Sequence, residues 1–142
     1  MSKTGPIILV EDDYDDEEIF REALSETGVE NELISFSTAH DAYEYLLIMT
    51  EQPFLIFCDV NLPKQSGLEF KKQIDSNPYL RQKSIPFLFN STSIDKRTVT
   101  EAYTQMAIQG YFLKQHEYRN VVSSLKNIIE YWCSCEHPSN YK

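Results

Sequence analysis

The sequence predicts an α/β fold, a doubly wound five-stranded parallel sheet covered by five helices. Short apolar runs alternate with stretches of helical period, which is the βα pattern that builds a parallel sheet. Charged residues directly follow three of these apolar runs, as expected where strand ends form a ligand crevice. A length of 142 residues allows one domain with one sizeable core. We therefore expect a single domain over 1–142, with its core at about 6–132 and a polar, frayed tail at 133–142.

The five apolar runs are the expected strands. They lie at residues 7–10, 33–37, 54–58, 85–89 and 110–113. Each is short and rich in bulky side chains, which is typical of a strand buried on both faces. A helical stretch follows each run, so we expect the strands to be parallel.

The five expected helices follow from apolar stripes and caps. Ser66 is a good N-cap for the third helix, and Pro78 is expected to lie beyond its end. The other four helices carry apolar residues at helical spacing. Their stripes are Ile19, Phe20, Ala23 and Leu24; Ala39, Ala42, Tyr43 and Leu46; Val99, Ala102, Tyr103 and Met106; and Tyr118, Val121, Val122, Leu125, Ile128, Ile129 and Trp132.

Charge and cysteine content limit the classes of function. The net charge of −9 opposes binding to nucleic acid or to an anionic membrane, because both need clustered Lys and Arg. No apolar run is long enough to span a bilayer, and the N-terminus lacks the apolar segment of a secretory signal. Three cysteines, an odd number, argue against a disulfide framework. We therefore expect a cytoplasmic protein whose partners are proteins or cations.

Polar and charged residues at the strand ends mark the expected site. The carboxyl ends of parallel strands lie at one edge of a sheet, so residues distant in sequence meet there. The candidates are Glu11, Asp12 and Asp13 after the first strand, Asp59 after the third, Ser91 after the fourth and Lys114 after the fifth. The acids at 15–18 are instead expected to be solvated charges in the first turn of a helix.

This acidic crevice predicts a metal and phosphoryl transfer. Two carboxylates about 4 Å apart repel by roughly 4 kcal/mol at an effective dielectric constant of 20, and Lys114 alone cannot balance several of them. Mg2+ suits an open site of a few carboxylates. Asp59 is ionised at neutral pH and can act as a nucleophile without a general base. The metal, Lys114 and the Ser91 hydroxyl would neutralise phosphoryl oxygens.

Four motifs that include these residues resemble the response-regulator receiver domains of two-component signalling, the family of the chemotaxis regulator. The motifs lie at residues 7–13, 58–70, 85–93 and 110–114. The resemblance covers about residues 6–132, and it implies a flavodoxin-like strand order of 2-1-3-4-5. A stand-alone receiver is not expected to be an enzyme beyond assisting its own phosphorylation and dephosphorylation.

The resemblance also implies a role for each site residue. Asp59 would accept the phosphoryl group and would bind Mg2+ together with Glu11, Asp12 and the backbone carbonyl of Asn61. Three other residues would complete the switch: Lys114 as the phosphoryl contact, Ser91 as the switch hydroxyl and Tyr111 as the aromatic switch. Gln115 departs from the family, which usually has a proline after a cis bond there, so the Lys114–Gln115 bond stays open between cis and trans.

The implied partners are a histidine kinase or a phosphotransfer protein, with output through the surface of the fourth helix, fifth strand and fifth helix. Output would be protein contact, relay to another phosphotransfer protein, or homodimerisation. Two alternatives stay open at this point. One is a receiver-like interaction module that no longer uses phosphorylation, and the other is a phosphatase of the haloacid dehalogenase kind. The phosphatase motif has a second Asp where Asn61 stands.

Overall fold

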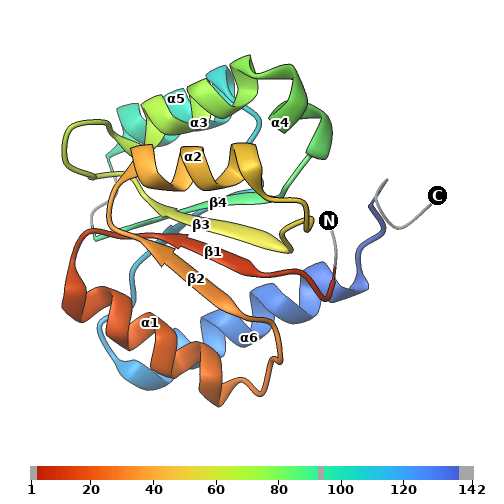
Figure 1. The fold of residues 1–142 in the computed structure, drawn as a ribbon. Coiled ribbons are helices and arrows are strands. Elements are labelled where there is room, and N and C mark those ends of the chain that lie inside the picture. The colour runs from red at the N-terminus through yellow and green to blue at the C-terminus, as the bar shows by residue number, and fades with distance from the viewer. Residues whose placement is uncertain (1–2, 93–94, 138–142) are drawn as a thin grey trace.

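The computed structural model describes residues 3–92 and 95–137 and contains one five-stranded parallel sheet (Figure 1). Its strand order is β2-β1-β3-β4-β5, the flavodoxin-like order that the family resemblance implied. All four pairings are parallel, and β1 lies between β2 and β3. The strands are β1 (Ile7–Val10), β2 (Leu33–Phe36), β3 (Leu55–Asp59), β4 (Phe87–Ser91) and β5 (Gly110–Leu113).

Helices cover both faces of the sheet, as the doubly wound prediction requires (Figure 1). Helices α1 (Tyr14–Glu26) and α6 (Tyr118–Ser134) pack on one face, and α2, α3, α4 and α5 lie over the other. These four are α2 (Ala39–Ile48), α3 (Gly67–Ser76), α4 (Pro78–Lys83) and α5 (Lys96–Gln105). Two apolar clusters result, one on each side of the sheet.

The prediction of five helices was wrong, because α4 is a sixth. Asn77 caps it through hydrogen bonds from the backbone N–H groups of Tyr79 and Leu80 to its side chain, and Pro78 occupies the first turn. Leu80 is its one buried residue. A helix of six residues with one buried side chain has no apolar periodicity to detect.

The prediction that every strand is buried on both faces was also too broad. All residues of β1 and β3 are buried, whereas all four residues of β2 are half-buried and β5 is partly open. The reason is position, because β2 and β5 are the two edges of the sheet. The central strands supply the deepest part of the core.

The C-terminal helix runs further than the expected core limit of 132, since α6 includes Cys133 and Ser134. Beyond it, the His137 ring lies with Nε2 2.7 Å from the carbonyl oxygen of Ser84. The last part of the expected polar tail, 138–142, lies outside the described residues. None of the helices in the described ranges has the length and apolar character to cross a membrane.

Candidate functional site

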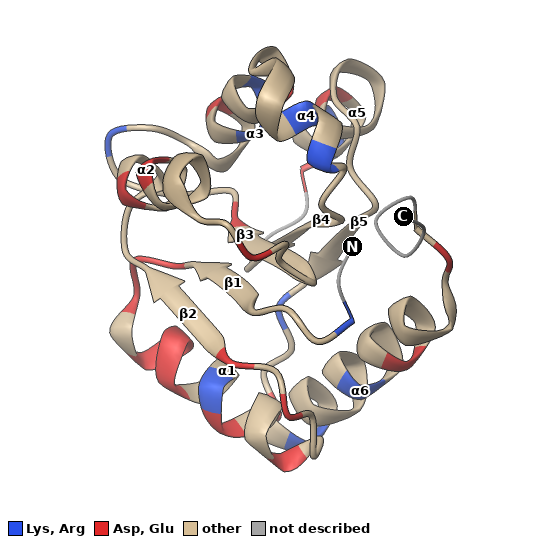
Figure 2. Ribbon diagram, turned by 45° about the vertical axis from the view of Figure 1, so that its right-hand side comes forward, with Lys and Arg blue, Asp and Glu red and all other residues tan. Residues whose placement is uncertain are grey.

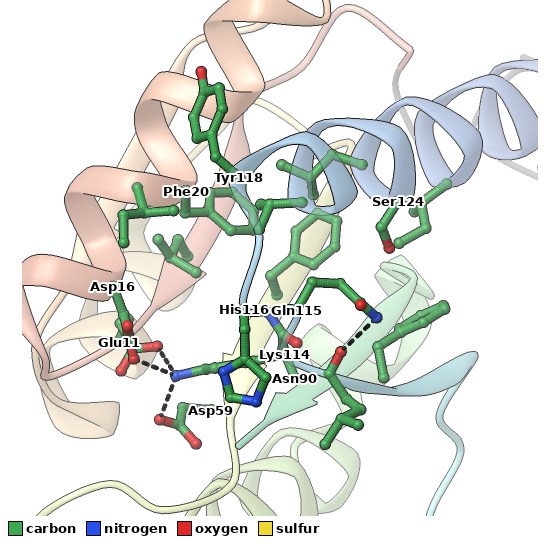
Figure 3. A pocket seen from close by; sticks show the side chains of 18 residues that line it. Glu11, Asp16, Phe20, Asp59, Asn90, Lys114, Gln115, His116, Tyr118 and Ser124 are labelled. Atoms are coloured by element: carbon green, nitrogen blue, oxygen red, sulfur yellow. Dashed lines mark hydrogen bonds and ion pairs between the residues drawn. The ribbon is translucent and has the colours of Figure 1, made fainter. Parts of the chain in front are cut away.

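The carboxyl ends of the strands bring the predicted residues together at one edge of the sheet (Figure 3). Asp59 and Ser91 are the last residues of β3 and β4, while Glu11 and Lys114 directly follow β1 and β5. Backbone hydrogen bonds extend the ladder to both: Glu11 N donates to Phe36 O over 2.9 Å, and Lys114 N donates to Ser91 O over 2.7 Å. Four strands therefore place these side chains.

Lys114 is the centre of the cluster. Its Nζ lies 2.5 Å from Glu11 Oε1, 2.9 Å from Asp16 Oδ2 and 3.1 Å from Asp59 Oδ2. An ammonium group has three N–H donors, so these three carboxylates occupy all of them. The lysine side chain is mostly buried, with 13% of its surface exposed. Figure 3 shows Nζ pointing at the acids that surround it.

The Asp59 carboxylate is held from both sides. Its Oδ1 accepts a hydrogen bond from the backbone N–H of Asn61 over 3.0 Å, while Oδ2 accepts from Lys114. The residue is buried apart from 8% of its surface. Two fixed contacts leave the carboxylate oriented toward the crevice that the strand ends form.

Burial dominates the electrostatics of this cluster. Burial raises the pKa of Glu11 to about 7; the hydrogen bond from Lys114 opposes the rise and the Asp59 charge adds to it. For Lys114, burial alone would lower the pKa, but hydrogen bonds to Glu11 and Asp16 outweigh it and raise the pKa above its usual range. The lysine therefore stays charged, and the cluster has more carboxylates than the one lysine can balance. A cation can neutralise this excess of negative charge.

Three carboxylates have the arrangement of a metal site. One oxygen from each of Glu11, Asp12 and Asp59 lies within 4.8 Å of the others. Asp12 is exposed and the other two are buried, so the group is open to solvent on one side. Carboxylate oxygens with room for retained waters are the donor set that Mg2+ or Mn2+ takes. The residues present therefore fit the predicted divalent cation.

Two acids near β1 have roles that differ from the sequence expectation. Asp13 is the N-cap of α1, and its side chain accepts hydrogen bonds from the backbone N–H groups of Asp15 and Asp16. Asp16 was expected to be a solvated charge, yet it pairs with Lys114. Figure 2 shows the acidic residues continuing from the end of β1 through α1. Nothing in a run of consecutive acids identifies which one turns inward, because that depends on where β5 ends.

Ser91 and Tyr111 lie on adjacent strands beside the cluster. Ser91 is 1% exposed, and the Tyr111 ring packs against Phe89 with 5.8 Å between the ring centroids. Burial raises the pKa of the Tyr111 hydroxyl, and a hydrogen bond with the Ser91 side chain opposes that rise. The two expected switch residues therefore lie near each other on the paired strands β4 and β5.

The family departure at Gln115 leaves Lys114 in place. No peptide bond between described residues is cis, so the Lys114–Gln115 bond is trans. The Gln115 side chain turns back, and its Nε2 donates to Leu113 O over 3.3 Å. Thr92 is exposed, and Ser93, which ends the third motif, lies outside the described residues.

A cavity of about 140 Å³ extends from the cluster between α1 and α6 (Figure 3). Glu11, Asp16, Asp59 and Lys114 line its polar end. The remaining wall is largely apolar and includes Ile19, Phe20, Phe112, Val121, Leu125 and Ile128.

Comparison with known proteins identifies the class to which this fold and site belong. A family model of the response regulator receiver domain matches residues 7–126, most of the chain, and the protein belongs to that family. It is 30% identical over 131 residues to the response regulator Rcp1 of Synechocystis sp., covering 89% of this chain and 87% of the relative. It is 28% identical to a probable chemotaxis protein CheY of Rhizobium etli, covering 68% of this chain and 70% of the relative.

Solved structures of response regulators have the same fold as this chain. The phosphorylated cyanobacterial phytochrome response regulator RcpA superposes with a TM-score of 0.82 at 30% identity, covering 96% of this chain and 98% of that one. The Mn2+-bound form of response regulator Rcp1 superposes with a TM-score of 0.78 at 27% identity, covering 92% and 96%. The chain is therefore a receiver domain of two-component signalling, a class consistent with phosphorylation-dependent signalling.

Proposed function

We propose that the protein accepts a phosphoryl group on Asp59 from a histidine kinase or a phosphotransfer protein and then signals by protein contact. The observation that carries this proposal is the contact of Lys114 Nζ with Asp59 and Glu11. Together with Asp12, these two residues form the group of three carboxylates that could hold Mg2+. A phosphoacceptor needs an ionised carboxylate, a lysine and a cation at one point. In this protein, Asp59, Lys114 and the carboxylates that could hold the cation lie together at the carboxyl ends of the strands.

The chemistry follows from the residues present. A carboxylate oxygen of Asp59 forms the bond to phosphorus while the bond between phosphorus and the donor histidine nitrogen breaks, and the electron pair leaves with that nitrogen. Bound Mg2+, held by Glu11, Asp12, Asp59 and the Asn61 backbone carbonyl, would supply charge neutralisation. Lys114 and the Ser91 hydroxyl would bind phosphoryl oxygens.

Phosphorylation would then bias a two-state surface. The added charge of about −1.5 to −2 attracts Lys114 and the Ser91 hydroxyl toward the phosphoryl group. Since Ser91 and Tyr111 lie on the paired strands β4 and β5, a shift of Ser91 would be passed to Tyr111. The surface of α5, β5 and α6 would be the output face, for an unidentified target protein or for a second copy of this chain.

The wider setting follows from the same proposal. We assign the given chain, 1–142, to one receiver domain without enzymatic turnover of its own. The three cysteines are free, which supports a reducing compartment such as the cytoplasm. Kinases linked to phytochromes are the first donors to test, because the cyanobacterial relative RcpA is described as a phytochrome response regulator.

The test is phosphorylation of the purified protein. Acetyl phosphate with Mg2+ should label the wild type with one labile phosphoryl group per chain, visible by intact mass, and Asp59→Asn should take none. Beryllofluoride with Mg2+ should perturb the domain in the same way. Failure of both reagents would favour the interaction module without phosphorylation. Sustained turnover of p-nitrophenyl phosphate would favour the phosphatase.

A further inference from the structure

Asp16 lies in the site although the receiver motifs give it no role. It belongs to the first turn of α1, and its backbone N–H donates to the Asp13 side chain over 3.1 Å. This cap holds the turn so that Asp16 Oδ2 reaches Lys114 Nζ at 2.9 Å (Figure 3). Asp15, the preceding residue, also gives its backbone N–H to the cap but makes no ion pair with Lys114.

Lys114 must give up one of its acceptors to bind a phosphoryl oxygen, because its three donors are all occupied. Asp59 is the phosphoacceptor, and Glu11 is buried with 5% of its side chain exposed. The Asp16 side chain is 36% exposed, so water can solvate it when the lysine leaves. Asp16 is therefore the acceptor whose release costs least.

We propose that Asp16 is a positioning residue that competes with the phosphoryl group for Lys114 and so sets the balance between the two states of the site. This inference rests on the proposed phosphorylation of Asp59. Without a phosphoryl group, Asp16 draws part of the lysine charge away from Glu11 and Asp59 and leaves them freer for a cation. With a phosphoryl group, the ion pair with Asp16 opposes the binding of Lys114 to the phosphoryl oxygens.

Asp16→Asn should therefore change two affinities in opposite directions. In Mg2+ alone, Lys114 of the variant would pair only with Glu11 and Asp59. The lysine would then compete more strongly with Mg2+ for these carboxylates, so the Mg2+ affinity should fall. At saturating Mg2+, Lys114 would lack its charged competitor, so the beryllofluoride affinity should rise. Each change should be about two- to five-fold, the size expected for a partly exposed ion pair. Isothermal titration calorimetry measures both affinities.

Three further variants separate this role from a structural one. Asp15→Asn removes the same charge from the same helical turn and should shift both affinities less. Asp16→Glu keeps the charge and should leave both affinities near those of the wild type. In a Lys114→Met background, Asp16→Asn should have no effect beyond that of Asp15→Asn, because the lysine carries the coupling.

The outcomes are distinguishable. A fall in both affinities for Asp16→Asn, or equal effects of Asp16→Asn and Asp15→Asn, would overturn the role of Asp16 while the phosphorylation proposal stands. Absence of beryllofluoride binding by the wild type in Mg2+ would overturn the proposed function and the inference with it. Thermal unfolding in EDTA shows that each variant is folded.

Discussion

The backbone N–H of Lys114 donates to the carbonyl oxygen of Ser91 over 2.7 Å. This hydrogen bond continues the pairing of β4 with β5 beyond its last strand pair, Ser91 with Leu113. The position of the Lys114 backbone is therefore set by this hydrogen bond to β4 and not by the residue at position 115. The substitution of the usual family proline by Gln115 therefore leaves Lys114 within reach of Asp59.

Lys114→Met should separate the cation site from the phosphoryl contact. The apolar stem stays while Glu11 and Asp59 lose their shared counter-charge, so the metal-free protein should be less stable by about 1–3 kcal/mol. Mg2+ should bind more tightly because its competitor is gone, and beryllofluoride more weakly because its contact is lost. Thermal unfolding with EDTA and with Mg2+ measures the first two effects, and titration measures the third.

Lys126→Met is the matched control for that prediction. Lys126 lies on an exposed position of α6 and makes no ion pair among the described residues. Its loss changes the net charge equally, so the stability and both affinities should stay near the wild type. Weaker Mg2+ binding by Lys114→Met would contradict the competition between lysine and metal.

Gly67→Ala should disturb the end of β3, where Asp59 lies. A Cβ atom at Gly67 would lie 2.4 Å from the backbone carbonyl oxygen of Asp59, and backbone cannot move aside as a flexible side chain can. We expect a loss of about 1–3 kcal/mol in the free energy of unfolding, measured by urea denaturation, together with weaker beryllofluoride binding.

Gly28→Ala is the contrasting variant. A Cβ atom there would have open space, and the cost is limited to a φ of +82°, which amounts to about 1 kcal/mol. Gly28 is remote from the cluster, so beryllofluoride binding should be unchanged. Equal loss of binding in both variants would mean that the contact of Gly67 with Asp59 is not what matters.

The thiol of Cys58 should resist modification in the folded protein. The residue has no exposed surface, burial raises its pKa well above the usual value, and Sγ donates to Asp59 O over 3.2 Å. Cys133 is exposed and Cys135 is partly exposed. Ellman's reagent should therefore titrate two thiols in the native state and the third only in denaturant.

Cys58→Ala tests that assignment. The variant should still show two reactive thiols in the native state and no additional one after unfolding. Three fast thiols in the native wild type would show that β3 opens much more readily than its burial implies.

The five strands, the doubly wound sheet and the acidic crevice were all predictable from the sequence. Apolar runs such as Ile7–Val10 identify buried strands because a parallel sheet has both faces covered. The prediction erred where local pattern is weak. The six-residue helix α4 has one buried side chain, and β2 is half-buried because it is an edge strand.

The sequence by itself determined which chemical groups are available at the strand ends, since each of Glu11, Asp59, Ser91 and Lys114 ends or follows a strand. Only the tertiary structure decided which groups touch. Asp13 caps α1, whereas Asp16 reaches Lys114 from a helix 98 positions earlier in the chain. The physical reason is that an ion pair depends on distances of about 3 Å, which the packing of α1 beside α6 on one face of the sheet sets and which residue spacing does not encode.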